Sequence, residues 1–365
     1  MSGPLRVLAM LTDAYDAGGG IAQYNRDWLS AVAATGALVE VCAFGDCERQ
    51  TSAIPAGVTV RCATRSRGAF ALHALKAAWS CTPHLVWCGH LHLAPLAALA
   101  ASLARAPLWL QVHGIDAWER PSRLRRMASE RALLVSAVSR YTRRRVLTWL
   151  SGDSSRVCVL PNTVGDGFTP ADKDPALASR LGIDSSPVIL TVGRLAAAEA
   201  YKGHDRIIAC MPELLLRFPE LRYVVVGDGD DRQRLQDVAQ RFGVSSHLRF
   251  VGTLAGGDLI AAYRLADAYV MPSTGEGFGI AFLEAMASGV PALGLDGDGS
   301  VDPLADGELG ESVSLAALTA GVQRLLEGGR DHGPSLAARV HARFGRSHFD
   351  AQVRRLLDRA IGLGA

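Results

Sequence analysis

Residues 271–291 read MPSTGEGFGIAFLEAMASGVP, and they hold the strongest local signal in the chain. The apolar residues 268–271 that lead into this segment have the length and composition of a buried β-strand. A loop rich in glycine follows, and a helix is predicted over residues 280–288. This order of strand, loop and helix predicts an anion site, because the first amides of a helix have no partner within it.

Two glutamates stand on either side of the predicted helix start. Glu284 lies about one turn inside the helix, roughly 6 Å from its start at about 1.5 Å per residue. From there it can reach a sugar that is joined to phosphates bound at Gly279 and Ile280. A carboxylate there suits the hydroxyl pair of a ribose. Glu276 lies on the loop, where the glycines allow close approach and its carboxylate could hydrogen-bond a transferred sugar. Taken alone, Glu284 is better explained as a solvated helix residue and the glycines as a simple turn, but the segment as a whole favours the anion site.

The run EGFGIAFLE, followed by AMASGVPAL, resembles the signature of retaining GT-B glycosyltransferases of the glycogen-synthase-like group, the glycosyl transferases group 1. The resemblance implies an α/β fold in which two Rossmann-like, doubly wound domains face a central cleft. It also implies a nucleotide-diphosphate sugar as the donor. Glu276 then belongs to the catalytic residues, and Gly279, Ile280 and Glu284 belong to the donor-binding residues.

The apolar runs before residue 165 agree with the first of two such domains. They alternate with helix-length segments, as parallel strands joined by crossovers do. A stretch rich in Asp, Pro and Gly then reaches residue 187 and is the best candidate for a linker. The predicted strands of this half are residues 5–11, 39–44, 58–62, 85–88, 108–112, 133–138 and 157–160.

The pattern restarts after the linker and predicts a second α/β domain. We expect an acceptor-side domain over residues 1–165 and a nucleotide-sugar domain over residues 175–345. A C-terminal helix over residues 346–365 is expected to pack back toward the first domain. The predicted strands of the second half are residues 188–192, 223–226, 248–251, 268–271 and 291–294.

Two cations follow the first strand of the predicted second domain. Arg194 ends the run TVGR, and Lys202 lies in the run YKGH, just before a predicted helix. Two cations near a helix start suit a diphosphate, although ordinary surface charge gives the same pattern. The resemblance implies that both hold the donor phosphates and stabilise the departing diphosphate. The spacing between them is longer than in the family's commonest form.

Two motifs in the first half also match family patterns. Gly18, Gly19 and Gly20 do not form a G-x-G-x-x-G fingerprint, and alone they indicate a tight turn. The family has a glycine-rich loop at this position, so the resemblance places Gly19 and Gly20 among the donor-binding residues. In the run VHGID, it implies that His113 hydrogen-bonds the transferred hexose and makes Asp116 a candidate acceptor contact. Ser139 and Asn162 are expected to have structural roles, either in a hinge or in the walls of the cleft.

Two acidic segments have features of metal sites. Residues 224–231, VVVGDGDD, are better explained as a strand that turns into a helix. Residues 296–302, DGDGSVD, open like a calcium loop but lack its glycine at the sixth position and its glutamate at the twelfth. We predict no metal and no cofactor, because cations and helix amides can stabilise the leaving group.

The composition narrows the class of protein further. The chain has 365 residues, a formal charge of +2 and seven cysteines without a C-x-x-C pair. The small charge argues against a nucleic-acid binder, and the cysteines favour reduced thiols in the cytoplasm. No apolar stretch reaches the length of a membrane span. The cytoplasm, with a peripheral position at the inner face of the membrane as an alternative, is the expected location.

The donor and the acceptor are less defined. Val251 is expected near the base, whose contacts do not distinguish a GDP sugar from a UDP sugar. The YKGH run, together with the basic stretch between Arg120 and Arg145, resembles bacterial polysaccharide mannosyltransferases, and this resemblance implies GDP-mannose. The acceptor is expected to be a saccharide, free or linked to a polyprenyl diphosphate. The basic stretch between Arg120 and Arg145 is either a solvated face or a contact with an anionic membrane.

The resemblance implies a retained anomeric configuration and front-face attack, in which the leaving phosphate accepts the proton of the acceptor and no protein nucleophile is needed. Two alternatives remain. A sugar-nucleotide 2-epimerase can share the fold and the donors but needs no acceptor. A non-catalytic nucleotide-sugar binding protein would show donor affinity without turnover.

Overall fold

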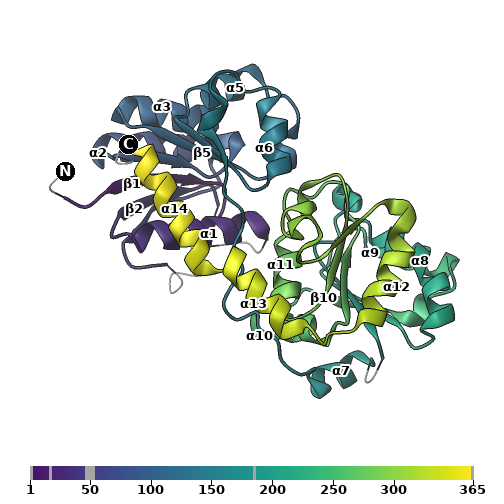
Figure 1. Cartoon of the computed structure of the whole chain (residues 1–365). Coiled ribbons are helices and arrows are strands. Elements are labelled where there is room, and N and C mark those ends of the chain that lie inside the picture. The colour runs from purple at the N-terminus through teal and green to yellow at the C-terminus, as the bar shows by residue number, and fades with distance from the viewer. Residues whose placement is uncertain (1–2, 16–18, 46–53, 184–185, 363–365) are drawn as a thin grey trace. The chain divides into compact units, whose positions relative to one another are not determined.

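The computed structural model describes residues 3–15, 19–45, 54–183 and 186–362, which form two compact units (Figure 1). The first unit is Met1–Thr163 with Ser347–Ala365, and the second is Val164–Arg346. Each unit has a parallel sheet with helices packed on it, so the predicted α/β class with two doubly wound domains is confirmed. Gly18, at the start of the predicted N-terminal loop, lies outside the described residues.

The first sheet has seven parallel strands, and every predicted strand of this half is present. The order β3-β2-β1-β4-β5-β6-β7 grows in both directions from β1, as in a doubly wound fold. The strands are β1 (Arg6–Leu11), β2 (Leu38–Ala43), β3 (Val58–Ala63), β4 (Leu85–Cys88), β5 (Leu108–Val112), β6 (Leu134–Ala137) and β7 (Val157–Val159).

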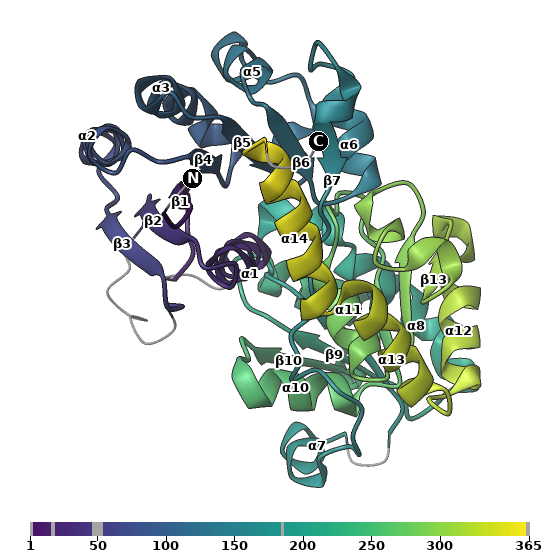
Figure 2. The ribbon, with the colours of Figure 1, turned by 60° about the vertical axis from the view of Figure 1, so that its left-hand side comes forward.

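Helices cover both faces of this sheet. Right-handed crossovers place α1 on one face and α2, α3 and α5 on the other, because the strand order reverses at β1 (Figure 2). The last helix, α14, lies beside α1, where Phe349 packs edge-on against Tyr24 at 5.8 Å between ring centroids. The helices are α1 (Gly20–Ala33), α2 (Arg67–Ser80), α3 (Ala94–Ala104), α4 (Ile115–Trp118), α5 (Arg123–Glu130), α6 (Arg140–Leu147) and α14 (Arg346–Ala360).

Three tryptophans fill the interior between α1 and the first sheet. Trp28 of α1 stacks on Trp87 of β4 with 3.8 Å between ring centroids, and Trp109 of β5 meets Trp28 edge-on at 5.5 Å. All three side chains are fully buried. Such aromatic contacts add to the free energy gained by burying the apolar strands, and they fix α1 on the sheet.

The second sheet has six parallel strands in the order β10-β9-β8-β11-β12-β13. The five predicted strands are present, and the sequence analysis missed β13 at the edge. The strands are β8 (Val188–Val192), β9 (Arg222–Val226), β10 (Leu248–Gly252), β11 (Ala268–Met271), β12 (Ala292–Leu295) and β13 (Glu311–Val313). The helices are α7 (Pro175–Leu181), α8 (His204–Arg217), α9 (Arg232–Arg241), α10 (Gly256–Leu265), α11 (Ile280–Ala287), α12 (Leu318–Gly328) and α13 (Gly333–Phe344).

The segment VVVGDGDD is the end of β9 and a tight turn into α9. Gly227 has a φ of 137°, and a Cβ there would lie 1.9 Å from the carbonyl oxygen of Gly193. Gly229, with a φ of 155°, approaches the carbonyl oxygen of Leu195 in the same way. The two glycines therefore let this turn pack directly against the loop that carries Arg194.

Candidate active site

The loop between β11 and α11 forms the predicted helix start. Gly279 has a φ of 91°, and a Cβ on it would lie 2.6 Å from Cδ2 of Phe282. A side chain at this position is excluded by both the backbone angle and the space. Gly279 therefore turns the chain sharply into α11, whose first amides at Ile280 follow directly at the carboxyl edge of the sheet.

Glu284 is held in place by a tyrosine. The hydroxyl of Tyr263, on α10, donates a hydrogen bond of 2.6 Å to Oε2 of Glu284. Burial raises the pKa of Tyr263 well above its usual value, so the hydroxyl keeps the proton that it donates. The sequence analysis missed Tyr263, which is fully buried and looks like a core residue of an apolar helix. Its hydroxyl fixes the orientation of the Glu284 carboxylate.

Replacing Tyr263 by Phe is expected to weaken donor binding about three- to tenfold, since one hydrogen bond to a charged group orients Glu284. The phenyl ring keeps the packing, so the melting temperature should change much less than in Tyr263→Ala. Titration calorimetry with the donor measures the change. An affinity equal to that of the wild type would show that the tyrosine does not position Glu284.

Glu276 is fixed through its backbone by an acidic loop. Its amide donates to Oδ2 of Asp298 at 2.7 Å, and its carbonyl accepts from the amide of Gly299 at 2.8 Å. Asp298 is itself held by the amide and the hydroxyl of Ser300, at 2.8 and 2.6 Å. Residues 296–302, the acidic segment that opens like a calcium loop, thus hold the loop of Glu276 in place through these hydrogen bonds.

The carboxyl of Glu276 has an unusual proton affinity. Burial raises its pKa to about 7, and the nearby carboxylates of Asp298 and Glu199 act in the same direction. The positive charge of Lys202 lowers the pKa in part. The loops of the two residues are joined by a hydrogen bond of 3.0 Å from the amide of Thr274 to the carbonyl of Tyr201. At neutral pH the group can therefore either accept or donate a hydrogen bond to a sugar hydroxyl.

Glu276→Gln is expected to stabilise the fold more at pH 8 than at pH 5. The folded carboxyl, with a pKa of about 7, binds a proton that an unfolded carboxyl with a pKa of 4.5 has released. Stability is therefore lost as the pH rises between these values, by about 1–3 kcal/mol. Thermal unfolding of the wild type and of Glu276→Gln at several pH values measures this difference in stability. A stability difference that does not change with pH would contradict the raised pKa.

Arg194 and Lys202 lie together around one carboxylate. Glu199 bonds the guanidinium of Arg194 through Oε1, and its Oε2 lies 2.7 Å from Nζ of Lys202. The three residues belong to the loop after β8 and to the short 3₁₀ segment Ala197–Lys202. Lys202 can approach the end of β8 because Gly193 has no side chain: a Cβ there would lie 3.3 Å from Nζ.

The two cations differ in exposure. The side chain of Lys202 is 13% exposed, whereas that of Arg194 is 74% exposed. The charge of the buried ammonium is screened less by water, so Lys202 is the stronger electrostatic group of the pair. Glu199, which the sequence analysis missed, occupies the position between them that an anionic ligand would compete for.

His113 lies in the first unit, directly after β5. Its Nε2 is 2.8 Å from the carbonyl oxygen of Gly89, which can only accept, so Nε2 carries the proton. Burial lowers the pKa of His113 to about 4, and the ring is neutral at pH 7. Tyr24 packs edge-on against it at 5.1 Å. Nδ1 is therefore an acceptor, which suits the predicted hydrogen bond from a hexose hydroxyl.

Asp116 supports the His113 loop. Its Oδ1 accepts from the amide of His113 at 3.3 Å, and burial raises the pKa of Asp116 to about 6. The carboxylate thus has a structural contact in addition to the predicted acceptor contact, which stays a prediction. Two further histidines, His90 and His92, follow strand β4. The centroid of the His90 ring lies 6.0 Å from that of the His113 ring. The sequence analysis missed both.

The remaining predicted residues lie at strand and helix ends. Gly19 has a φ of 127° and precedes α1, which begins at Gly20. Ser139 caps α6, its hydroxyl accepting from the amide of Thr142 at 3.0 Å, and Asn162 is buried after β7. Val251 lies at a bulge in the edge strand β10.

Two family models match the chain. The model described as glycosyl transferases group 1 matches residues 174–340, and the glycosyl transferase 4-like domain matches residues 19–163. The chain belongs to the group 1 glycosyltransferases. The two matched ranges correspond to the two units of the structure.

Curated relatives of this group 1 glycosyltransferase include two mycobacterial enzymes. A GDP-mannose-dependent alpha-(1-6)-phosphatidylinositol monomannoside mannosyltransferase of Mycolicibacterium smegmatis is 32% identical over 56% of this chain. A phosphatidyl-myo-inositol mannosyltransferase of Mycobacterium tuberculosis is 32% identical over 63% of it. The matched regions span 55% and 60% of those relatives. The Anabaena protein Alr3699/HepE, solved with UDP and glucose, has a TM-score of 0.79 at 21% identity, covering 97% of this chain and 99% of its own.

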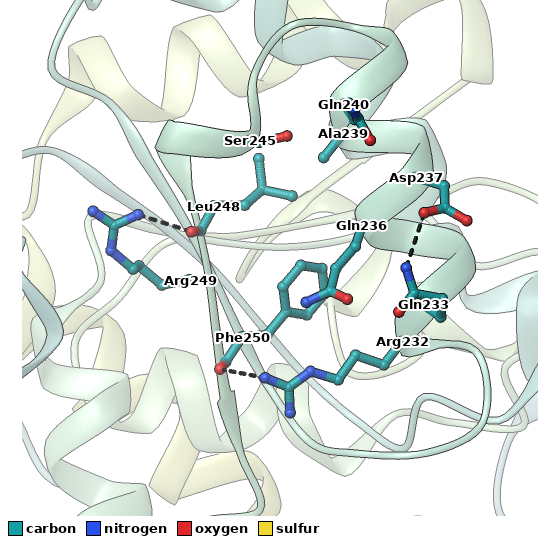
Figure 3. A pocket seen from close by; sticks show the side chains of 10 residues that line it. All are labelled: Arg232, Gln233, Gln236, Asp237, Ala239, Gln240, Ser245, Leu248, Arg249 and Phe250. Carbon is teal, nitrogen blue, oxygen red and sulfur yellow. Dashed lines mark hydrogen bonds between the residues drawn. The ribbon is translucent and has the colours of Figure 1, made fainter.

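The group 1 glycosyltransferase also has a surface pocket of about 390 Å³ between α9 and the edge strand β10 (Figure 3). Arg232 crosses one end of it and donates to the carbonyl of Phe250 at 3.2 Å. None of the predicted site residues lines this pocket. The walls of this pocket are formed by one side of α9 and by the edge strand β10. The loop that carries Glu276 does not contribute to it.

The described acidic segments and histidines do not combine into a metal site. Within the described part of the chain, no three His, Cys, Asp or Glu side chains are grouped so as to hold a metal ion. Asp231, in the acidic segment VVVGDGDD, pairs with Arg234 at 2.6 Å. Metal-independent chemistry in this group 1 glycosyltransferase stays a prediction.

Proposed function

We propose that this chain is a retaining glycosyltransferase that moves a hexose from a nucleotide-diphosphate sugar to a glycan or lipid-linked saccharide. One observation carries the proposal. At the carboxyl edge of the second sheet, two cations after β8 lie around Glu199, and the amide of Thr274 joins their loop to the Glu276 loop through the carbonyl of Tyr201 at 3.0 Å. The Glu276 loop then leads on to α11 and Glu284. Cations, free helix amides and a carboxylate are the groups that recognise phosphates and a ribose.

In the proposed donor complex each group has one task. Lys202, Arg194 and the amides at Gly279 and Ile280 bind the diphosphate, and the phosphate oxygens displace Glu199 from the cations. Glu284, oriented by its tyrosine, accepts hydrogen bonds from the ribose. The carboxyl of Glu276 contacts the hexose.

The proposed transfer breaks the bond between the anomeric carbon and the leaving phosphate oxygen. A bond forms between that carbon and the acceptor oxygen on the same face, and the acceptor proton moves to the leaving phosphate. The anomeric configuration is retained. Negative charge grows on the diphosphate during this step, so fixed cations lower the barrier. His113, with its acceptor nitrogen, would orient a hexose hydroxyl.

We propose GDP-mannose as the donor. The two mycobacterial relatives are named as mannosyltransferases, and one of them as GDP-mannose-dependent. Their names also support a lipid-linked acceptor. A reaction at the cytoplasmic side of the membrane belongs to the same proposal. No helix in the described residues is long and apolar enough to cross a membrane.

The test is a transfer assay with purified full-length protein, GDP-mannose and short-chain polyprenyl-diphosphate saccharides, with and without EDTA. We expect a mannosylated product whose anomeric configuration by NMR matches that of the donor, formed at the same rate with EDTA. A product of inverted configuration would refute retention. Conversion of the donor to its 2-epimer without acceptor would identify the epimerase alternative, and binding without any turnover would identify the binding-protein alternative.

A further inference from the structure

We propose that the outer face of α2, α3 and α5 binds an anionic lipid bilayer. These helices cover one face of the first sheet, and α3 packs against both of its neighbours (Figure 2). The bilayer-facing surface is defined by the exposed apolar side chains on these helices and just after α5, together with the basic residues between them.

Exposed apolar side chains are concentrated on this surface. Of twelve large apolar side chains that are exposed in the described residues, eight lie between residues 72 and 133. Trp79 is 72% exposed and Leu72 is 67% exposed. Single exposed apolar residues are ordinary, but a group of them on neighbouring helices marks a binding surface. The members on the three helices and the following turn are Leu72, Trp79, Leu99, Leu103, Leu124, Met127 and Leu133.

The exposed residues of α2 point away from the sheet. Ala74 and Ala77 are buried against it, and Leu72 and Trp79 each stand two positions away from one of them along the helix. At 100° per residue, two positions turn a side chain about 200°, to the opposite side of the helix. The apolar side chains are therefore directed outward and are not part of the core.

The charge of this region identifies the partner. Residues 65–145 contain thirteen arginines and lysines against three acidic residues, although the whole chain has a formal charge of only +2. Neither α2 nor α3 contains an Asp or Glu. An anionic partner is therefore favoured. Exposed leucines do not stack on bases, but they do enter the acyl boundary of a bilayer, so an anionic membrane fits better than a nucleic acid.

The basic stretch between Arg120 and Arg145 divides into two parts in the structure. On α6, Arg143 and Arg145 donate to the backbone carbonyls of Val157 and Trp118, at 2.7 and 3.1 Å, and stabilise the fold. On α5, Arg123 is exposed beside Leu124 and Met127. The bilayer-facing surface is thus centred on α5 and its neighbours, and it does not extend evenly over the whole basic stretch.

A small pocket adds a site for a phosphate. Arg105 and Arg131 line a cavity of about 200 Å³ at the amino ends of β5 and β6, and Leu133 forms part of its wall. Two guanidinium groups in one pocket suit the phosphate of a lipid headgroup, while Leu133 in its wall meets the acyl chains.

The experiment uses full-length protein and vesicles of phosphatidylcholine, alone or mixed equally with phosphatidylglycerol. We expect cosedimentation with the anionic vesicles only, weakened by salt. Arg105→Glu with Arg131→Glu should reduce binding at least about tenfold, and Trp79→Ser should reduce it about tenfold. Brominated acyl chains should quench the fluorescence of the wild type but much less that of Trp79→Ser.

Matched control variants carry the same changes elsewhere. Leu216→Ser removes an exposed leucine of α8, and Arg354→Glu with Arg355→Glu reverses two charges on α14, which lies on the other face of the first sheet. Both should bind vesicles like the wild type. All variants should bind the donor normally, so vesicle binding and the proposed transfer activity can fail independently.

Three outcomes would overturn the proposal: equal binding to neutral and anionic vesicles, no binding to either, or equal loss in the α14 control. Sedimentation velocity without lipid gives a further check. A dimer that dissociates in Trp79→Ser, without vesicle binding by the wild type, would make this surface a contact between two copies of the chain.

Discussion

Lys202→Ala is expected to lower kcat about 100- to 1,000-fold, the usual effect of removing one fixed group that stabilises a developing negative charge. The side chain of Lys202 is mostly buried, so water replaces its charge poorly. KM for the donor should rise much less than kcat falls, because the diphosphate gains its charge as the bond breaks. Steady-state kinetics with saturating acceptor separate the two constants.

The matched control for this variant is Lys173→Ala. Nζ of Lys173 contacts the carboxylate of Asp267 at 2.7 Å, next to the amino end of β11 and thus at the opposite edge of the same sheet. This variant should lose stability but keep its kcat. A Lys202→Ala enzyme with a kcat within threefold of the wild type would show that the lysine does not stabilise the leaving diphosphate.

Glu284→Ala is expected to weaken donor binding about 100-fold or more, because two ribose hydroxyls lose a charged acceptor. The loss should be similar for the donor sugar and for the free nucleoside diphosphate, since both contain the ribose. It should also exceed the loss in Tyr263→Phe, which only releases the orientation of the carboxylate. Titration calorimetry with both ligands measures these differences.

Glu327→Ala is the control for the lost carboxylate. Glu327 forms a surface ion pair with Arg217 at 2.6 Å, on α12 and α8. Its removal should leave donor affinity unchanged. If Glu284→Ala weakened the binding of the donor sugar but not of the nucleoside diphosphate, the carboxylate would contact the hexose instead of the ribose.

The sequence was sufficient to predict the sheets and the start of α11. Continuous apolar runs of four to seven residues mark buried parallel strands, and glycine marks a turn that excludes a side chain, as at Gly279. The edge strand β13 was missed because Glu311–Val313 has three residues, one of them charged, and is only partly buried. Such a segment has no periodicity to detect.

The residues that support the candidate site were harder to predict than those that form it. Tyr263 and Glu284 are 21 positions apart, and only the packing of α10 beside α11 brings them together. Glu199 stands in the alanine-rich run AAAEAYK, where a single acid resembles a surface residue. The contact of Asp298 with the amide of Glu276 likewise depends on two loops from different strands. Contacts of this kind follow from the tertiary structure and leave no local pattern.

The most direct test of the central claim is titration calorimetry of the purified chain with GDP-mannose, GDP-glucose, UDP-glucose and ADP-glucose, with and without EDTA. We predict that one nucleotide-diphosphate sugar, GDP-mannose, binds with a 1:1 stoichiometry and that EDTA does not change its affinity. If no nucleotide-diphosphate sugar binds under either condition, the cations and glutamates of the second unit do not form a donor site, and the proposed glycosyl transfer is wrong.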